Sequence, residues 1–317
     1  MPRILLVKTS SLGDVVHNLP VASDIGAAIP EVEIDWVVEE AYAPIPALHP
    51  RVTRVIPVAV RRWRRNLLER RTRAELKSFA HELRARRYDA IIDTQGLFKS
   101  ALIARAAHGP CYGMDWRSAG EPLAIFYDRA FDIPREQNAV ERNRALAARA
   151  LRYTCPAAVR YELTPARVPH ERQASPDYAV LIHATSARRK LWPEERWIAL
   201  GKVLAGRGTA AVLPWGTEEE RRRSERIAAA VPGAISPARS PLDRVAQLLA
   251  GSRCTVGVDT GLTHLAGALG VPTVGVYSAT DPAATGLYGC ARALNVGGIG
   301  AAPGVADVLR GLERLIS

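Results

Sequence analysis

The sequence predicts an α/β protein with two doubly wound parallel-sheet domains, and three observations support this fold class. The chain has 317 residues, and at roughly 100–200 residues per domain this length favours two domains, each with its own core. Short β-branched runs alternate with helical stretches, which is typical of parallel α/β units. The alternation occurs twice, on either side of a stretch at 154–176 that contains four prolines and no clean periodicity.

Each half of the chain contains enough predicted strands for a sheet of its own. In the first half, the predicted strands cover residues 4–7, 34–38, 55–58 and 90–93, and the predicted helices cover 15–28, 74–87, 99–107 and 139–151. In the second half, the predicted strands cover 179–183, 210–213, 255–258 and 273–277, and the predicted helices cover 193–205, 218–230, 242–249, 262–269 and 305–316.

These elements predict one domain over residues 1–153, a linker over 154–176 and a second domain over 177–317. Open α/β sheets bind ligands outside the carboxyl ends of their strands. We therefore expect the two domains to face each other across a cleft, and this cleft is the expected active site.

The composition excludes several classes of protein. With 48% hydrophobic and 24% charged residues, the chain is not of a disordered, collagen-like or disulfide-scaffold type. The formal net charge is +11, and residues 61–73 supply a net +6 because seven arginines stand there against one acid, Glu69. A basic chain commonly meets nucleic acid, an anionic membrane surface or a small anionic substrate.

The cysteines and the start of the chain predict a cellular compartment. The four cysteines, at positions 111, 155, 254 and 290, lack metal-ligand spacing and are expected as free thiols in a reducing cytosol. The apolar run at residues 4–7 is too short for a signal peptide, and nowhere do 18 apolar residues run free of charge. We expect a cytoplasmic protein for which any membrane contact is peripheral.

The first motif follows the first predicted strand. KTSSLGDVVHNLP, at 8–20, contains a turn of small residues and then Asp14 before an apolar-periodic helix. Asp14 is either the N-cap of that helix or a carboxylate that accepts a proton from a hydroxyl nucleophile.

The second motif, GVDTGLTHLAGALG at 257–270, places a turn and a helix start directly after a strand. Free N–H groups and the positive end of the helix dipole favour a phosphate at such a place. Asp259 would accept a hydrogen bond from a sugar hydroxyl or from the turn, and Thr260 and His264 would donate to phosphate oxygens. The alternative is a capped helix with His264 on its inner face.

The third motif is HATSARRKLWPEERW, at 183–197, again after a strand. Thr185 and Ser186 supply hydroxyl donors and Lys190 supplies a compact cation. This set suits a diphosphate leaving group, whose negative charge rises as it departs. The alternative is a solvated basic loop.

Two further stretches have two interpretations each. In PWGTEEERRRSER, at 214–226, the acids of the first helical turn complement the helix dipole, or one of them, Glu220, holds the hydroxyls of a ribose. RRWRR, at 61–65, is a solvated arm or an anion clamp, because arginine matches phosphate and carboxylate bidentately. A lone Trp63 is weak evidence for base stacking.

Taken together and in this order, the motifs resemble those of the ADP-heptose:lipopolysaccharide heptosyltransferase family, closest to its heptosyltransferase I branch. The resemblance covers nearly the whole chain. It rests on KTSSLGDVVHNLP, DWVVEE, VIPVAVRRWRR, YDAIIDTQGLFKSA, YGMDW, AVER, WPEERW, PWG, VDTGLTHL and TDP.

The resemblance implies a GT-B fold, with the acceptor bound by the first domain and the donor by the second. The implied reaction is an inverting transfer of L-glycero-D-manno-heptose from ADP-L-glycero-D-manno-heptose to a 3-deoxy-D-manno-octulosonic acid (Kdo) residue of Kdo2-lipid A, in lipopolysaccharide inner-core synthesis. Asp14 would be the general base. The implied donor-binding residues are Thr185, Ser186, Lys190, Glu220, Ser240, Asp259, Thr260, Gly261 and His264, and the implied acceptor-binding residues are Arg61, Arg62 and Arg64.

Some positions depart from the family pattern. Ser186 stands where a second threonine is expected, which keeps the hydroxyl. Gly120 stands where the resemblance implies an acceptor-binding arginine, and Arg117 is the nearby residue that would replace it. The sequence has no Asp-x-Asp motif, so we expect no metal and no cofactor, with Lys190 and a helix start in the metal's place.

The expected partners are the sugar nucleotide, the lipid acceptor and, peripherally, the anionic cytoplasmic face of the inner membrane; no nucleic acid is expected. One alternative is a GT-B-like nucleotide-sugar epimerase, which would turn over the sugar nucleotide alone. Another is a basic nucleic-acid-binding module, whose affinity would fall steeply with salt. A third is a heptosyltransferase that adds the second heptose, although the RRWRR cluster favours the first transfer, onto adjacent Kdo carboxylates and lipid phosphates.

Overall fold

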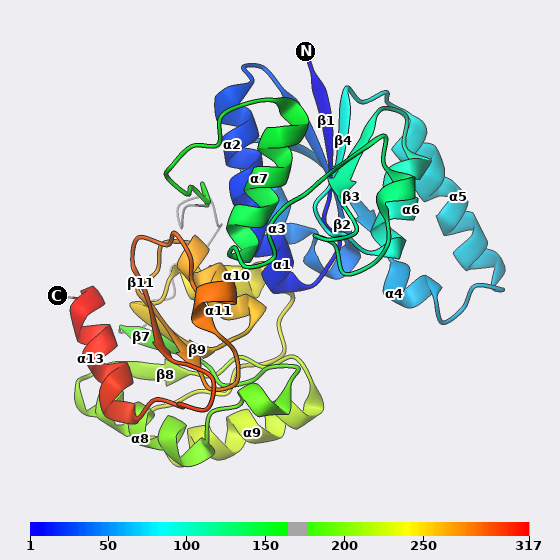
Figure 1. The fold of residues 1–317 in the computed structure, drawn as a ribbon. Coiled ribbons are helices and arrows are strands. Elements are labelled where there is room, and N and C mark those ends of the chain that lie inside the picture. Colours follow the sequence, from blue (N-terminus) through cyan, green and yellow to red (C-terminus); the bar gives the residue numbers. More distant parts are fainter. Residues whose placement is uncertain (164–176, 317) are drawn as a thin grey trace. The chain divides into compact units, whose positions relative to one another are not determined.

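The structure, a computed structural model, describes residues 1–163 and 177–316. The chain divides into two compact units, Met1–Glu162 and Leu163–Ser317, and each has a parallel sheet with helices on both faces (Figure 1). The boundary between the units falls within 154–176, the stretch predicted as the linker. Of that stretch, residues 164–176 lie outside the described residues.

The sheet of the first unit has six strands in the order β3-β2-β1-β4-β5-β6. Its strands are β1 (Arg3–Val7), β2 (Glu33–Glu39), β3 (Val52–Val58), β4 (Ala90–Asp93), β5 (Cys111–Met114) and β6 (Arg129–Phe131). The direction of winding reverses between β1 and β4, where Val7 pairs with Asp93 in register. The loops after these two strands therefore leave the sheet side by side, which is where doubly wound sheets bind ligands.

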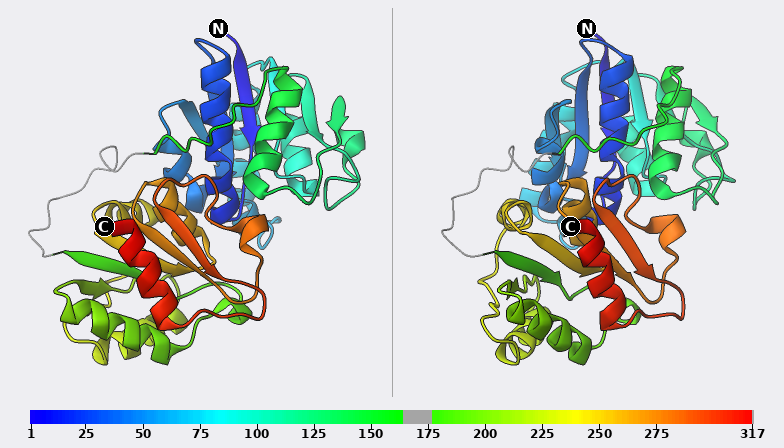
Figure 2. Two further views of the ribbon diagram at one scale, coloured as in Figure 1. Left: turned by 60° about the vertical axis from the view of Figure 1, so that its left-hand side comes forward. Right: turned by 90° about the vertical axis from the view of Figure 1, so that its left-hand side faces the viewer.

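Helices cover both faces of this sheet. In Figures 1 and 2, α1, α2 and α7 lie on one face and α5 and α6 on the other. The helices are α1 (Leu12–His17), α2 (Leu19–Ala28), α3 (Pro44–Ala47), α4 (Val60–Trp63), α5 (Arg70–Arg84), α6 (Phe98–Ala106) and α7 (Ala139–Leu151), with short 3₁₀ turns η1 (Glu40–Tyr42) and η2 (Ala124–Phe126).

The sheet of the second unit has five strands in the order β11-β10-β9-β7-β8. Its strands are β7 (Tyr178–Ile182), β8 (Ala210–Val212), β9 (Cys254–Val258), β10 (Thr273–Tyr277) and β11 (Ala293–Gly297). Here the winding reverses between β7 and β9, where Ile182 pairs with Gly257. The loops after β7 and β9, which carry the third and the second sequence motif, are therefore neighbours.

The helices of the second unit enclose a core with two fully buried indoles. Trp192 and Trp197 meet edge to face with ring centroids 5.0 Å apart and pack with residues of α8, α9 and α13. The elements are η4 (Arg188–Lys190), α8 (Glu194–Gly206), α9 (Glu218–Ala229), α10 (Leu242–Ala250), α11 (Gly261–Ala268), α12 (Pro282–Thr285) and α13 (Val305–Ile316). No helix among the residues placed by the structure is long and apolar enough to cross a bilayer.

The structure corrects several of the predicted elements, and it adds the short helices α3, α4 and α12, which were not predicted. The strands β5, β6 and β11 were not predicted, because CYGM, RAF and ALNVG contain no β-branched run. The single helix predicted at 15–28 is two helices, α1 and α2, that meet at Asn18, with Pro20 in the first turn of α2. The helix predicted from residue 74 begins at Arg70.

A buried ion pair connects α2 to α7. The side chains of Asp24 and Arg144 are 3% and 1% exposed, and Arg144 Nε lies 2.7 Å from Asp24 Oδ2. The same guanidinium donates to the carbonyl oxygens of Pro156 and Ala158. It therefore also holds the chain that follows α7.

We expect Asp24→Ala to lower the free energy of unfolding by about 3–5 kcal/mol, because it removes the buried partner of Arg144 and leaves that guanidinium with only the part-exposed Glu141 carboxylate, at 3.0 Å. Urea unfolding at neutral pH measures this. The control is Glu313→Ala, which breaks an ion pair with Arg207 whose partners are 51% and 55% exposed; such a pair contributes about 0–1 kcal/mol. Equal losses in the two variants would contradict the expectation.

Candidate active site

Three strand ends of the second unit bring polar side chains onto one carboxylate, that of Asp259. Lys190, after β7, donates to Asp259 Oδ2 over 2.7 Å. Thr280, after β10, donates to the same oxygen, also over 2.7 Å. His264 Nε2, on α11, lies 3.3 Å from Asp259 Oδ1. The structure thus brings the second and third motifs into direct contact.

Asp259 is ionised in this setting although it is only 5% exposed. Burial alone would raise its pKa, but the hydrogen bonds from His264, Lys190 and Thr280 outweigh burial and hold the pKa well below its ordinary value. A permanent negative charge therefore stands beside Lys190. The ammonium has three N–H donors, so it can keep Asp259 and still contact another anion.

The start of α11 adds donors that have no partner within the helix. Thr260 is the N-cap in an extended conformation, and its side chain makes no capping bond. The N–H groups of Gly261 and Leu262, the first two of the helix, have no intrahelical acceptor, and the helix dipole makes this end positive. Thr185 Oγ1 donates to the carbonyl oxygen of Asp259 over 3.4 Å, while Ser186 is exposed. This arrangement can bind a phosphate.

Glu220 and Ser240 are not in hydrogen-bond contact with the Asp259 group. Glu220 Oε2 accepts from the backbone N–H groups of Gly216 and Thr217 at 2.7 and 3.0 Å, and Thr217 Oγ1 accepts from the Glu220 N–H at 3.3 Å. This reciprocal pair caps α9, with Thr217 as the N-cap. Ser240 is exposed and donates to the Ala238 carbonyl.

In the first unit, Asp14 is not the N-cap of the helix. Ser11 is the N-cap of α1, and Asp14 is the third helical residue. The Ser11 N–H and Oγ–H both donate to Asp14 Oδ2, at 2.7 and 2.9 Å. No hydrogen bond between described residues reaches Asp14 Oδ1, and the residue is half-buried. One carboxylate oxygen is thus held by the chain and the other can accept a proton.

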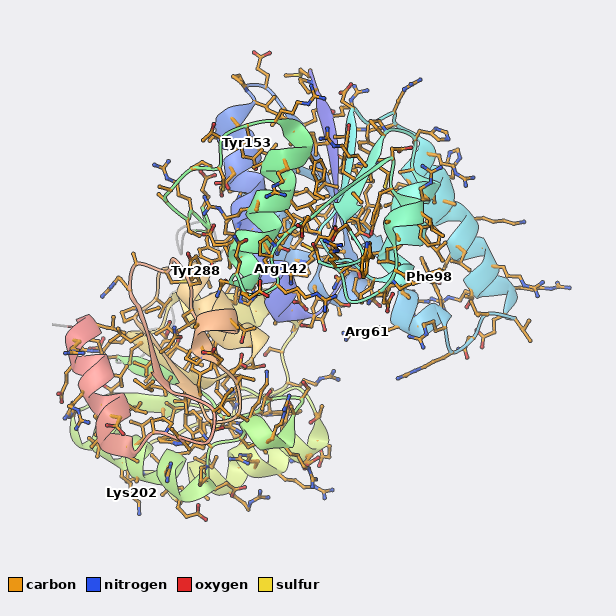
Figure 3. The ribbon with its side chains drawn as sticks, in the orientation of Figure 1. Arg61, Phe98, Arg142, Tyr153, Lys202 and Tyr288 are labelled. Atoms are coloured by element: carbon orange, nitrogen blue, oxygen red, sulfur yellow. The ribbon has the colours of Figure 1, made fainter. Side chains whose placement is uncertain are left out.

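The three predicted acceptor arginines differ in their surroundings. Arg61 donates to the Tyr42 hydroxyl over 2.9 Å; it is labelled in Figure 3. Arg62 forms ion pairs with Glu40 at 3.0 Å and with Glu75 at 2.6 Å, so much of its charge is compensated by the protein. Arg64 is exposed. Arg61 and Arg62 also line a surface pocket of about 360 Å³.

Trp63 belongs to the core and not to a stacking surface. Its side chain is 6% exposed and its ring packs against Phe79 at 5.6 Å between centroids. The indole N–H donates to Glu75 Oε2 over 2.8 Å, and this bond, with that from Arg62, lowers the pKa of Glu75 to about 2. Trp63 anchors α4, so that the neighbouring arginines are presented on an ordered turn.

Sequence reasoning missed Lys99 and Thr280. Lys99 Nζ donates to Ser10 Oγ over 2.7 Å. Burial lowers the pKa of Lys99, the charge of Glu39 raises it, the charges of Arg61 and Arg64 lower it further, and the charge of Asp14 raises it. The runs YDAIIDTQGLFKSA and TDP contain these two residues. Nothing in either run distinguishes Lys99 or Thr280 from its neighbours as a site residue.

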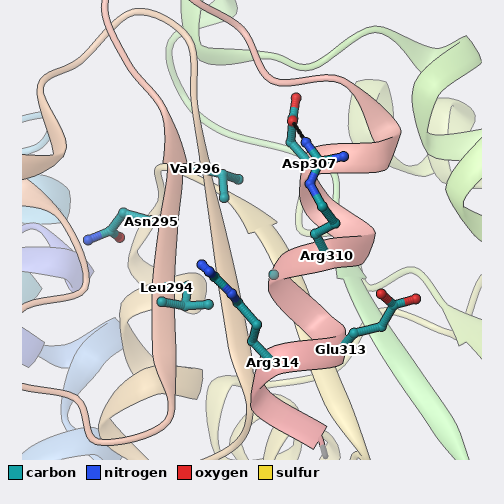
Figure 4. Close-up of a pocket in the computed structure, with 8 residues that line it drawn as sticks. Leu294, Asn295, Val296, Asp307, Arg310, Glu313 and Arg314 are labelled. Atoms are coloured by element: carbon teal, nitrogen blue, oxygen red, sulfur yellow. Dashed lines mark hydrogen bonds and ion pairs between the residues drawn. The ribbon is translucent and has the colours of Figure 1, made fainter.

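A pocket beside the edge strand β11 of the second unit is not this site. A pocket of about 560 Å³ lies between β11 and α13, where Figure 4 shows Leu294 and Val296 directed toward the helix and Asn295 directed away from it. None of the residues predicted for the site lines it. The site instead follows the strand ends, as the topology requires.

The cysteines form no disulfide: all four are free, as expected. Within residues 1–163 and 177–316, no group of three or more histidine, cysteine, aspartate or glutamate side chains is arranged to hold a metal ion.

Comparison with known proteins identifies the family. A family model described as glycosyltransferase family 9 (heptosyltransferase) matches residues 76–305. The chain belongs to glycosyltransferase family 9. It is 46% identical over 295 residues to lipopolysaccharide heptosyltransferase 1 of Escherichia coli K12, covering 90% of this chain and 91% of the relative. It is 47% identical over 290 residues to the protein of that name from Pseudomonas aeruginosa, covering 90% and 81%.

Solved structures of the same family share the fold. The E. coli heptosyltransferase WaaC, solved with ADP, matches with a TM-score of 0.91 at 43% identity, over 98% of this chain and 99% of that one. E. coli heptosyltransferase II matches with a TM-score of 0.78 at 23% identity, which concerns the fold alone. The predicted GT-B fold and the prediction of a glycosyltransferase are confirmed.

His183, the first residue of the third motif, lies fully buried after β7. Neither ring nitrogen has a hydrogen-bond partner among the described residues. Burial lowers the pKa of His183 from 6.5 to about 4, because the imidazolium would lose its hydration. The imidazole is therefore neutral and is packed in the core at the end of β7.

We expect the free energy of unfolding to fall by on the order of 3 kcal/mol between pH 6.5 and pH 4, because only the unfolded chain protonates this histidine in that range. His183→Leu should remove this part of the pH dependence in urea unfolding. His108→Ala, at an exposed position, is the control and should keep it. An unchanged pH dependence in His183→Leu would contradict the assignment.

Proposed function

We propose that this chain is an inverting heptosyltransferase that moves L-glycero-D-manno-heptose from ADP-heptose to a Kdo residue of Kdo2-lipid A. One observation carries the proposal: Lys190 is bonded to Asp259, which directly precedes the N-cap of α11, at the ends of β7 and β9, in a chain 43% identical to a heptosyltransferase solved with ADP. A second structure of WaaC contains ADP-2-deoxy-2-fluoro heptose and matches at 42% identity with a TM-score of 0.86.

The second unit would stabilise the leaving group. As the bond between the heptose and the diphosphate breaks, negative charge rises on the phosphate oxygens of ADP. Lys190, the hydroxyls of Thr185 and Thr260 and the Gly261 N–H would offset that charge, and donors already fixed in place need no reorganisation during the reaction. Ser186 and His264 would complete the diphosphate contacts.

The rest of the donor would lie against polar groups nearby. Asp259 would accept hydrogen bonds from heptose hydroxyls, because its charge is fixed by Lys190 and Thr280. Glu220 would hold the ribose through Oε1, since Oε2 caps α9. Ser240, exposed before α10, would lie near the adenosine.

The first unit would supply the base. Asp14 Oδ1 would take the proton of the acceptor hydroxyl while the hydroxyl oxygen bonds to the anomeric carbon and the ADP oxygen leaves. Attack from the side opposite ADP inverts the configuration. The hydrogen bonds from Ser11 to Oδ2 leave Oδ1 for this task.

The arginine cluster would hold the anionic acceptor. Arg61 and Arg64 would contact Kdo carboxylates or lipid phosphates, with Lys99 as a third cation. Arg62 would contribute less, because Glu40 and Glu75 already pair with it.

The function is tested by measuring ADP release from ADP-heptose with and without Kdo2-lipid A. We expect release only with the acceptor, and we expect Asp14→Ala to lower kcat at least 100-fold while it still binds ADP, because a general base contributes about 10²–10⁴-fold. The control is Asp307→Ala, which also removes a first-turn carboxylate that accepts a backbone N–H. It should retain full turnover.

ADP release without acceptor would favour a hydrolase, and conversion of ADP-heptose to an epimeric ADP-sugar without acceptor would favour an epimerase; either result would end the proposal. Turnover only on an acceptor that already carries one heptose would replace the first transfer by the second. Full turnover of Asp14→Ala would remove Asp14 as the base.

We also propose that the enzyme works at the anionic cytoplasmic face of the inner membrane. Two leucines between α4 and α5, Leu67 and Leu68, are 54% and 83% exposed. They are flanked by the arginines of 61–73. Apolar side chains that enter the interface and cations that meet anionic lipid together favour peripheral binding.

We expect the protein to cosediment with vesicles that contain phosphatidylglycerol and not with pure phosphatidylcholine vesicles, and we expect salt to weaken the binding. Leu67→Ser with Leu68→Ser should weaken it several-fold, because less apolar surface leaves water. The matched control is Ile235→Ser with Ile299→Ser, at positions 52% and 72% exposed in the second unit. Equal loss in the two double variants would contradict a specific role for this loop.

A further inference from the structure

The loop that carries Asp14 is fastened by the side chain of Gln95. Gln95 Oε1 accepts hydrogen bonds from the backbone N–H groups of Thr9 and Ser10, both at 3.0 Å. These two residues directly precede Ser11, which holds Asp14. The amide oxygen thus fixes two consecutive peptide units next to the residue that orients the proposed base.

Gln95 is itself held by Asp93, which is fully buried at the end of β4. Asp93 Oδ1 accepts from the N–H groups of Gln95 and Gly96 at 2.9 and 3.2 Å. Asp93 Oδ2 accepts from the hydroxyls of Ser100 and Tyr127 at 2.8 and 2.9 Å. Gly96 has φ +66°, a conformation that favours glycine. The turn that presents Gln95 is therefore anchored to the core.

Two lysines also connect the loops after β1 and β4. Lys8 Nζ, buried, donates to the Thr94 carbonyl over 2.7 Å, and Lys99 Nζ donates to Ser10 Oγ over 2.7 Å. From the opposite side, the Glu39 N–H donates to the Thr9 carbonyl over 3.0 Å. Both lysines are charged groups with other possible roles, whereas Gln95 is neutral and its oxygen contacts the backbone alone.

We propose that Gln95 is a positioning residue for Asp14: it holds the Thr9–Ser10 backbone, and through Ser11 it keeps the Asp14 carboxylate in one place. The inference rests on the proposed function, in which Asp14 is the base. A general base works only within hydrogen-bond reach of the proton that it takes, and a displacement of about 1 Å can lower a rate about 100-fold.

The first test compares two substitutions of Gln95. Gln95→Met has a similar length but no acceptor, so two N–H groups lose their partner; kcat should fall about 10- to 100-fold, with KM for ADP-heptose within about two-fold. Gln95→Glu keeps an acceptor oxygen and should restore kcat to within a few-fold, with the pH profile shifted upward because a second carboxylate lies near Asp14.

A double variant separates positioning from a general structural effect. In the Asp14→Ala background, Gln95→Met should lower the residual rate less than two-fold, because effects of residues that act together are not additive. If Gln95→Met has the kcat of the unchanged chain, or costs as much without Asp14 as with it, the proposal is overturned. If Gln95→Met does not fold, Gln95→Asn withdraws the oxygen by one methylene and carries the same expectations.

Amide hydrogen exchange tests the hydrogen bonds from Thr9 and Ser10 to Gln95 without any turnover. Thr9 and Ser10 should exchange slowly in the unchanged chain and in Gln95→Glu, and at least ten-fold faster in Gln95→Met. This result is independent of the heptose transfer, so a failed proposed function and a failed fastening are distinguishable. Unchanged exchange in Gln95→Met would overturn the inference whatever the activity assay gives.

Discussion

The ion pair between Lys190 and Asp259 is the interaction on which the proposed donor site depends. Asp259 is almost completely buried at the end of β9, and an unpaired charge in that position is strongly destabilising. The loop after β7 must therefore fold back so that Lys190 reaches it, and the segment after β10 must bring Thr280. The same folding places Thr185 beside the start of α11. A group needed for stability thus assembles the donors that a diphosphate requires.

The first unit also has a buried carboxylate, that of Asp93, at the carboxyl end of its own sheet. Asp93 accepts hydrogen bonds from hydroxyl and backbone donors, none of them a cation, and burial raises its pKa. The pKa of Asp259 is lowered because Lys190 and His264 are its partners. The first carboxylate is suited to hold a turn, and the second to hold a cation that an anionic ligand can share. Both occur where the winding of a doubly wound sheet reverses.

The sequence predicted those features that have a strong local signal. β-branched runs predicted the central strands. Small residues followed by a helical pattern predicted the two loops that follow β7 and β9. The strands β5, β6 and β11 lack such runs. The burial of Trp63 and the pairing of Arg62 depend on Glu75, which lies a helix away, and local patterns do not report such contacts. The roles of Thr280 and Gln95 come from strands that are adjacent in space and distant in the chain.

The most direct test of the donor site is calorimetric titration of ADP into the full chain and two variants. Lys190→Met removes the cation and should weaken ADP binding at least ten-fold, because a hydrogen bond to a charged group contributes about 1.5–3 kcal/mol. Asp259→Asn keeps a side chain of the same size but removes the charge that draws Lys190 to the end of β9, so it should also weaken ADP binding. ADP binding that is unaffected by both substitutions would contradict a donor site that this ion pair assembles.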